Sequence, residues 1–268
     1  ISTRLILGGS QENTVLSCEG QARLGHRVDL AFGPIFGPEG SLLARVQAFN
    51  ARCSEGLERV APHPRAVRGE GEAVRPIGLH EVPSMVRQVA PLTDRRGFLE
   101  LVELIKRLEP DIVHTHSSKA GILGRWAAMR VRLREKAHTP GIVHTIHGPP
   151  FNPVSGGLIS RAKIGLMNHA YTLAERSAAR SCDVIVSVAD AMTRQFLARG
   201  IGEASQYRTV YSGMEIERYL NPAGAIDTAD GQGVRRALGL GADDFVIGTV
   251  ARLAEQKGHD DLLSALAA

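Results

Sequence analysis

The 268-residue sequence is poor in cysteine and aromatic residues, and it lacks long apolar runs. Its three cysteines, Cys18, Cys53 and Cys182, are odd in number and lack metal-type spacing, which favours a reducing cytoplasm over a disulfide framework. No apolar run reaches the roughly 20 residues of a membrane span, and no signal peptide is visible. Aromatic residues make up only 4%, so Ala, Val, Leu and Ile must form most of the core.

The sequence also lacks a large excess of either positive or negative charge. Lys and Arg number 32 and Asp and Glu number 28, which gives a net charge of +4. This mild excess suits anionic ligands but is far from a nucleic-acid-binding arm, so we expect no nucleic-acid partner. With 43% hydrophobic residues, the chain is long enough for two domains, or for one domain and part of another.

Short apolar, β-branched runs alternate with helical patterns along the first 200 residues. The predicted strands are 1–7, 27–32, 111–115, 142–146 and 183–188. The predicted helices are 14–24, with Asn13 as its N-cap, 96–107, 119–134, 161–181 and 191–199. No element is assigned to residues 33–75. This alternation predicts an α/β fold with a doubly wound parallel sheet.

The domain organisation follows from a change of composition. Residues 1–210 form the predicted first domain, 211–244 a Gly- and Asp-containing interdomain crossover, and 245–268 the start of a second domain. The chain opens without Met inside a predicted strand and stops ten residues after Gly258. We therefore expect it to be truncated at both ends.

The last predicted strand leads into two cations. An apolar run from Phe245 precedes Arg252, and Lys257 and Gly258 follow before a helical pattern over 260–268. The carboxyl end of a buried strand is where α/β sheets bind ligands. An Arg fork and a Lys point charge at that edge suit a diphosphate.

Gly8 and Gly9 follow the first predicted strand and precede its helix. Such a loop exposes backbone N–H groups at a helix N-terminus, which favours an anion. The alternative is a tight turn that needs glycine for its backbone angles. A nicotinamide site is disfavoured because the dinucleotide fingerprint lacks its third glycine, and the acidic residue at the right distance, Asp29, lies inside a strand pattern.

Histidines stand at the ends of two further strands. His116, Ser117 and Lys119 follow one strand at the position where ligand groups belong, although helix capping also explains the serine pair at 117 and 118. His114 alternates with Val113 and is expected to pack in the sheet. His147 ends the next strand before a Gly-Pro loop. A functional role for it is favoured over a structural one, and zinc is disfavoured for want of a third ligand.

Two charged features have ordinary explanations. Glu175 and Arg176 fit an intrahelical or solvated ion pair. A basic helix with interleaved apolar residues includes Lys119, Arg125, Arg130, Arg132, Arg134 and Lys136. Such a face can lie against anionic lipid, although a plain surface helix is the simpler interpretation.

Taken in order, these motifs resemble the retaining nucleotide-sugar glycosyltransferases of family 4, which have the GT-B fold. The resemblance is carried by residues 3–14, 25–28, 110–121, 144–148, 182–188, 210–214 and 248–258. It covers nearly the whole chain and is weakest over residues 33–90. It implies a Rossmann-like acceptor domain and a second Rossmann-like domain, present only in part, that binds the nucleotide sugar.

The resemblance also implies roles for single residues. Gly8 and Gly9 would border the donor phosphates, and His147 would lie beside the transferred sugar. Arg252 and Lys257, with Gly258, would bind the diphosphate and neutralise the leaving group. His116, Ser117 and Lys119 would contact the acceptor.

The resemblance further implies a metal-independent enzyme without a cofactor beyond its donor substrate. Its partners would be a nucleotide sugar and a glycan or lipid-linked acceptor, with peripheral contact to an anionic membrane. The family's pair of donor-binding glutamates lies beyond residue 268, so we expect this chain to be inactive alone. The alternatives are a sugar-nucleotide epimerase of GT-B architecture, a non-catalytic nucleotide-sugar-binding module and, more remotely, a nicotinamide oxidoreductase.

Overall fold

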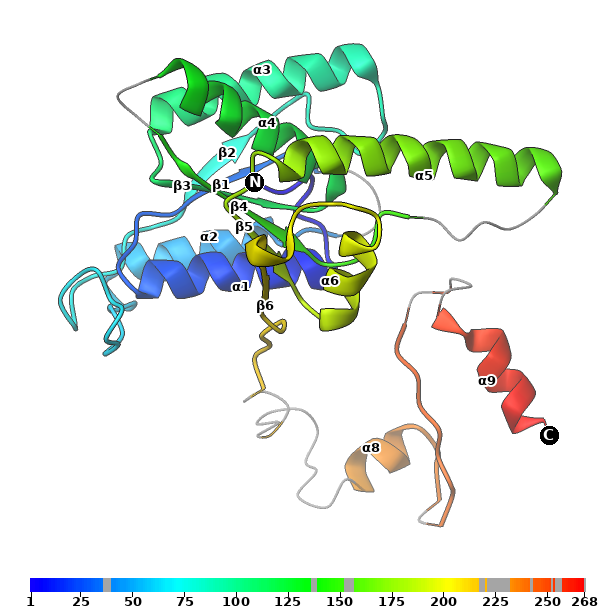
Figure 1. The fold of residues 1–268 in the computed structure, drawn as a ribbon. Coiled ribbons are helices and arrows are strands. Elements are labelled where there is room, and N and C mark those ends of the chain that lie inside the picture. The colour runs from blue at the N-terminus through cyan, green and yellow to red at the C-terminus, as the bar shows by residue number, and fades with distance from the viewer. Residues whose placement is uncertain are drawn as a thin grey trace. The chain divides into compact units, whose positions relative to one another are not determined.

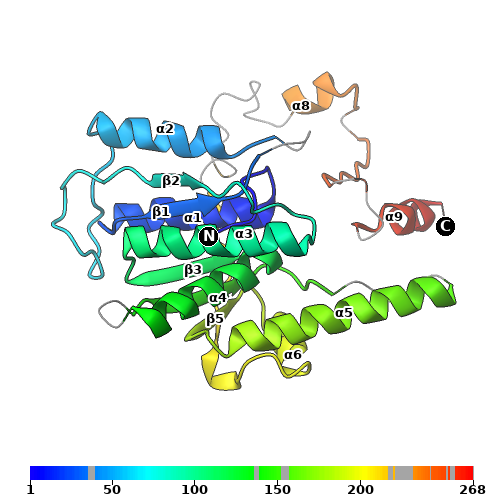
Figure 2. The same ribbon diagram turned by 90° about the horizontal axis from the view of Figure 1, so that it is seen from above.

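The computed structural model describes residues 1–268 except 36–39, 136–138, 152–156, 217–219, 221–231, 242, 252, 254–256 and 268. The chain divides into two compact units, Ile1–Met214 and Glu215–Ala268. We describe each unit by itself (Figures 1 and 2).

The first unit is built on parallel strands. They are β1 (Asp29–Phe32), β2 (Gly78–Glu81), β3 (Ile112–His116), β4 (Gly141–Ile146), β5 (Val184–Ser187) and β6 (Tyr207–Thr209). β1 pairs with β2, and β3 to β6 pair in sequence order, every pair parallel. Residues 1–3 join the two groups, because Ser2 bridges Phe32 on β1 while the Ile1 carbonyl accepts a 2.8 Å hydrogen bond from the His116 amide on β3. The resulting order is β2, β1, the N-terminal segment, β3, β4, β5, β6.

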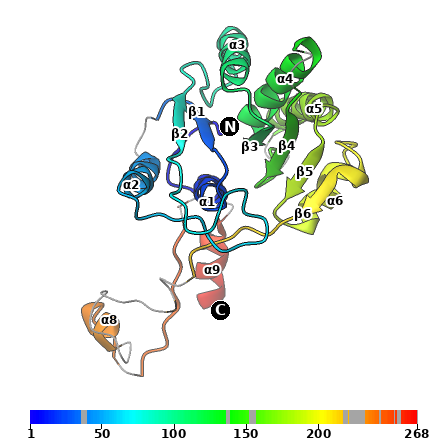
Figure 3. The ribbon, with the colours of Figure 1, turned by 90° about the vertical axis from the view of Figure 1, so that its left-hand side faces the viewer.

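Helices connect these strands on both sides of the sheet. They are α1 (Gly9–Arg23), α2 (Leu43–Ser54), α3 (Pro91–Leu108), α4 (Ser118–Arg134), α5 (Leu158–Ala179) and α6 (Asp190–Leu197). Seen end-on, α1 and α2 lie on one side of the sheet and α3, α4 and α5 on the other (Figure 3). The chain therefore winds outward in both directions from the N-terminal segment, which is the doubly wound arrangement that the sequence predicts.

The helix α3 illustrates why the sequence folds this way. Pro91 stands in its first turn, where a missing N–H costs nothing. Leu101, Val102 and Ile105 recur at helical spacing and are buried in the core beneath α3 and α4. Glu109 ends the helix in a left-handed conformation just before Pro110. A second apolar core lies around α1, α2, β1 and β2, and all three cysteines are buried and unpaired.

Several elements differ from the sequence-based expectation. α1 begins at Gly9 and not at residue 14, so Asn13 is an interior residue and Gly8 is the N-cap. The first turn was missed because Ser10, Gln11 and Glu12 are polar, and the predicted start was placed where the apolar residues begin. The N-terminal strand is reduced to a bridge at Ser2. α2, β2 and β6 were not predicted.

The second unit is sparse in regular structure. Its described helices are α8 (Gln232–Ala237) and α9 (His259–Leu266). The strand predicted from Phe245 is wrong, because residues 244–251 form no strand and Phe245 is 92% exposed. A strand needs a neighbour for its backbone hydrogen bonds and cover for its side chains, and the described residues of this unit supply neither.

A buried ion pair joins α4 to α5. Arg125 Nη2 lies 2.6 Å from Glu175 Oε2, and the two side chains are 1% and 2% exposed. Arg125 Nε also donates to the Gly121 carbonyl at 2.9 Å. The sequence interpretation of Glu175 as part of a solvated or intrahelical pair is therefore wrong, and so is the placement of Arg125 on a basic outer face.

Candidate active site

The topology predicts a ligand-binding edge at the N-terminal segment, which we call the strand-end crevice. This segment lies between β1 and β3, and the connections from these two strands run in opposite directions along the sheet. In open α/β sheets, ligands bind at the carboxyl ends of the strands on either side of such a switch point. Gly8 and Gly9 follow the N-terminal segment, and His116 and Ser117 end β3. These four predicted residues therefore belong to the same edge of the sheet.

Gly8 and Gly9 form an open helix start. Glu12 N donates to the Gly8 carbonyl at 2.8 Å, which is the first bond of α1. The N–H groups of the preceding helical residues therefore lack an intrahelical acceptor. The φ angle of Gly8 is −177°, which any residue can adopt, and a Cβ on Gly9 would meet nothing within 4 Å. The tight-turn explanation is wrong, and the helix start suits an anion.

Ser117 has an unusual backbone. As the N-cap of α4 it has φ 61° and ψ 161°, a region occupied almost only by glycine. Its hydroxyl makes no cap hydrogen bond to α4 and instead lies 2.7 Å from the Thr3 hydroxyl. Thr3 Oγ1 in turn accepts from Ala120 N in the first turn of α4 at 3.3 Å. The capping explanation for Ser117 is thus wrong: Thr3 caps α4 from a neighbouring segment. Strain of about 1–3 kcal/mol at such a position is typical of ligand sites.

The two strand-end histidines are in direct contact. His116 Nδ1 lies 3.0 Å from His147 Nε2, and the rings stack with centroids 5.3 Å apart. His114 lies behind them, 4.3 Å from His116 by ring centroids, with Nε2 2.7 Å from Thr145 Oγ1. A Cβ added to Gly121 of α4 would meet His144 at 2.5 Å, so His144 faces α4. The other three histidines alternate with it and share the opposite face.

Burial keeps these histidines neutral. It lowers the pKa of His147 to about 4 and that of His114 to about 3. The pKa values of His116 and His144 are held well below their ordinary value for the same reason. A hydrogen bond between two imidazoles needs one ring to donate and the other to accept, so neutrality also maintains the contact between His116 and His147. His147, half-buried just beyond the end of β4, is then a neutral group at the carboxyl edge of the sheet.

Stability should fall in acid because of these shifts. Each histidine has a lower pKa when folded than the 6.5 of an unfolded chain, so the unfolded state takes up protons first as pH falls. We expect the free energy of unfolding to decrease between about pH 6.5 and pH 4, with His147 alone contributing on the order of 3 kcal/mol. Denaturant titrations in steps of pH will measure this slope. H147Q should make it shallower, and an unchanged slope would contradict the assignment.

Lys119 does not join the histidines. Its ammonium pairs with Asp94 of α3 and also donates to the Gln88 carbonyl. The charge thus points toward the start of α3. Its predicted acceptor role stays a prediction.

The predicted diphosphate residues belong to the second unit. Lys257 is exposed, and Gly258 is the N-cap of α9 with φ 65°, a value that favours glycine. Arg252 lies outside the described residues. Within the described part of the chain, no three His, Cys, Asp or Glu side chains are grouped so as to hold a metal.

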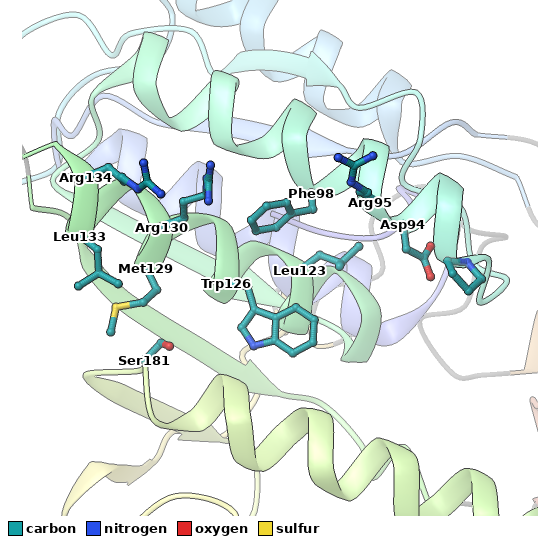
Figure 4. A pocket seen from close by; sticks show the side chains of 11 residues that line it. Asp94, Arg95, Phe98, Leu123, Trp126, Met129, Arg130, Leu133, Arg134 and Ser181 are labelled. Atoms are coloured by element: carbon teal, nitrogen blue, oxygen red, sulfur yellow. The ribbon is translucent and has the colours of Figure 1, made fainter.

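A hollow of about 630 Å³ opens elsewhere, on the outer face of α4. Phe98 of α3 and Trp126 and Met129 of α4 line it, with Arg95 and Arg130 at its rim (Figure 4). None of the predicted site residues of the described first unit borders this hollow. The predicted site residues of the first unit therefore belong to the carboxyl edge of the sheet and not to this hollow.

Comparison with known proteins identifies the family of the chain and its fold. Residues 8–213 match the family described as Glycosyl transferase 4-like domain. The chain belongs to this family. This glycosyl transferase 4-like chain is also 31% identical over 176 residues to UDP-Gal:alpha-D-GlcNAc-diphosphoundecaprenol alpha-1,3-galactosyltransferase from Escherichia coli. That match covers 66% of the chain and 41% of the relative, so the chain spans less than half of that protein.

Solved structures show the same fold for this glycosyl transferase 4-like chain. A glycosyltransferase from Rickettsia africae matches 99% of the chain and 55% of its own, with a TM-score of 0.61 at 14% identity. Sucrose-phosphate synthase from Thermosynechococcus elongatus matches 97% of the chain and 54% of its own, with a TM-score of 0.57 at 16% identity. The predicted fold class, GT-B with a Rossmann-like first domain and part of a second, is confirmed.

Proposed function

We propose that the protein to which this chain belongs is a glycosyltransferase that moves a sugar from a nucleotide diphosphate sugar to an envelope or polysaccharide acceptor. We further propose that it retains anomeric configuration and acts without a metal. The observation that carries the proposal is the open helix start at Gly8–Gly9 at the same sheet edge as the paired strand-end histidines, in a chain whose residues 8–213 match a glycosyltransferase family.

Sugar transfer requires groups that stabilise the leaving diphosphate and a group that contacts the transferred sugar. Breaking the anomeric bond places negative charge on the leaving diphosphate and positive charge on the sugar. The exposed N–H groups at the start of α1 suit the phosphates, and Arg252 and Lys257 would neutralise the leaving oxygens more strongly as the charge develops. The neutral His147 would donate or accept a hydrogen bond at the sugar without adding a second positive charge near it.

The alternatives fit the residues less well. Asp29 would have to end its strand to bind a nicotinamide ribose, but it begins β1, and its carboxylate lies 2.8 Å from His80 Nε2 and 3.1 Å from Arg27 Nε. An epimerase would need an acid and a base placed around the sugar, and the described residues offer no such carboxylate beside His147. A nucleotide-sugar-binding module without chemistry stays open as the second candidate.

The acceptor is proposed to be lipid-linked. The Escherichia coli relative is named for a diphosphoundecaprenol acceptor, and a carrier of that kind would place the reaction at a membrane surface on the cytoplasmic side. No helix among the described residues is long and apolar enough to cross a bilayer. We therefore propose peripheral contact with an anionic membrane, with His116 and Ser117 on the acceptor side.

The function is tested by turnover. We propose that the 268-residue chain does not transfer sugar by itself, because its diphosphate residues lie in a unit of only 54 residues, Glu215–Ala268. A version extended through a complete second domain should transfer labelled sugar from UDP- or GDP-sugars to a lipid diphosphate acceptor, while the 268-residue chain should not. Comparable turnover by both would refute the inactivity of the shorter chain. No transfer by either would count against the function.

A further inference from the structure

The first 16 residues of α5, 158–173, form a helix segment without cover in the described first unit. We call them the outer segment of α5. Leu158 and Ile159 are 87% and 88% exposed, Leu166 is 73% exposed and Leu173 is 50% exposed. In both side and top views the segment stands clear of the neighbouring helices of this unit (Figures 1 and 2). Only the last turns of α5 are buried, at Glu175, Ala178 and Ala179.

The exposed apolar residues lie on one face of the helix. At 100° per residue, Leu158, Ile159, Leu166 and Leu173 fall within about 100° of one another. Ala162 and Ala170 lie on the same face, and the exposed His169 lies among them. We call the six apolar residues of this face the α5 stripe. The face that packs on the domain, marked by Glu175, Ala178 and Ala179, lies roughly opposite. A surface helix ordinarily turns its apolar face inward, and this one turns it outward.

The charges around the α5 stripe are all positive. No Asp or Glu occurs between Glu135 and Glu175. Arg161 and Lys163 are exposed and flank the stripe on its two sides. An outward apolar stripe bordered by cations, with no acid nearby, complements an anionic lipid surface, where apolar side chains enter the acyl boundary and cations meet headgroups.

The basic helix α4, singled out from the sequence for this role, is the weaker candidate. Lys119 pairs with Asp94, Arg125 is buried against Glu175, and Arg132 pairs with Asp183. Most of its described cations are thus engaged within the protein. The large apolar side chains of the α5 stripe, by contrast, are at least half exposed and are not covered by other described residues of the unit.

The position of α5 links this surface to the candidate active site. α5 follows the carboxyl end of β4 and runs back toward the amino end of β5. Its 22 residues span about 33 Å, whereas the six residues of β4 span only about 20 Å. Since the buried turns are at its C-terminal end, the excess length projects beyond the sheet edge at which His116 and His147 lie. A bilayer against the stripe would therefore be on the acceptor side.

We propose that the α5 stripe inserts into the surface of an anionic lipid bilayer and holds the acceptor edge of the sheet against it. The proposal rests on the proposed function for its biological purpose, because a lipid-linked acceptor would be presented there. The binding itself needs neither donor nor acceptor. Vesicle binding and sugar transfer are therefore separable, and either can fail without the other.

The test is co-sedimentation of the 268-residue protein with vesicles of phosphatidylcholine containing 30% phosphatidylglycerol, at about physiological salt. We expect binding to these vesicles and much weaker binding to pure phosphatidylcholine. The triple substitution L158Q/I159Q/L166Q should lower the partition coefficient by about tenfold or more. R161Q/K163Q should lower it several-fold, and added salt should weaken the wild type but have less effect on this variant.

A matched control removes the same number of exposed apolar side chains elsewhere in the unit. Leu57, Val67 and Val89 are 66%, 58% and 69% exposed, and L57Q/V67Q/V89Q should bind as the wild type does. Thermal unfolding should be nearly unchanged in both triple variants, which verifies that they fold. Equal loss of binding in the two triple variants, or unchanged binding in the stripe variant, would overturn the proposal.

Two further readouts separate insertion from other forms of contact. A tryptophan placed by I159W in a W126F background should be quenched by phospholipids brominated on their acyl chains, and absence of quenching would overturn insertion. Sedimentation velocity without vesicles should show a monomer. A dimer that L158Q/I159Q/L166Q converts to monomer would make the stripe an interface between copies of this chain and would refute the proposal.

Discussion

Replacing His147 by alanine should lower kcat for sugar transfer by about 10²–10³, measured in a version of the protein that carries a complete second domain. The imidazole ends β4 at the predicted sugar position, and His116 Nδ1, 3.0 Å from its Nε2, fixes the ring. Burial keeps its pKa near 4, so the group acts as a neutral hydrogen-bonding partner. Loss of a contact that strengthens in the transition state lowers kcat more than it raises KM.

The control is H26A. His26 is an exposed histidine that precedes β1, at the amino edge of the sheet away from the crevice, and its removal should leave kcat unchanged. The pH profile adds a second readout. Because the pKa of His147 is about 4, the wild type should show no loss of activity near pH 6.5 attributable to this group. A kcat for H147A within threefold of the wild type would contradict a catalytic role.

Replacing Glu175 by glutamine should lower the free energy of unfolding by about 3–5 kcal/mol, because it leaves the charge of Arg125 buried without a partner. Arg125 is fully buried and its Nη1 makes no hydrogen bond among the described residues, so Glu175 is its principal compensation. Denaturant unfolding at pH 7 measures the change. The pair also fastens the inner turns of α5 to α4, from which the outer segment projects.

The matched control is a surface pair. Lys106 Nζ and Glu135 Oε1 are 3.2 Å apart, but their side chains are 40% and 45% exposed. E135Q should therefore change stability by less than about 1 kcal/mol. The double variant R125M/E175L should recover most of the loss, since it removes both buried charges. Equal effects of E175Q and E135Q would contradict the buried pair.

The elements that the sequence predicted best are those with strong periodicity and clear ends. β3 and β4 are short β-branched runs between turn residues, and the end of α3 before Pro110 was predicted to within one residue, although α3 begins at Pro91 and not at the predicted residue 96. The ends of these two strands also predicted that His116 and His147 share one edge of the sheet. The parallel sheet then followed from the alternation alone.

What the sequence did not predict depends on tertiary contacts. α2 and β2 lie in a Gly- and Pro-rich region, and β2 is half-exposed without a clear alternation. Ser117 has the composition of a cap, but only the folded chain brings the Thr3 hydroxyl to the start of α4. Glu175 is on an ordinary-looking helix, and its partner is 50 residues away. One feature of the sequence could have indicated that Glu175 is buried: Ala178 and Ala179, three and four residues later, share its face of the helix.

The outward face of α5 shows a different limit. The sequence predicted a helix over 161–181, whereas α5 runs from Leu158 to Ala179, so its two most exposed apolar residues lie outside the predicted helix. The face opposite the stripe packs instead, through small residues and the buried Glu175. The apolar pattern alone does not show whether such residues face the core or the solvent; the exposure of Leu158 and Ile159 in the folded chain does.

The strand-end crevice is proposed to bind a nucleotide sugar. Calorimetric titration of the protein extended through its second domain with UDP, GDP and NAD tests it most directly. We expect saturable binding of one nucleoside diphosphate, weakened by K257A, and no binding of NAD. Binding of NAD without any response to UDP or GDP would contradict the account.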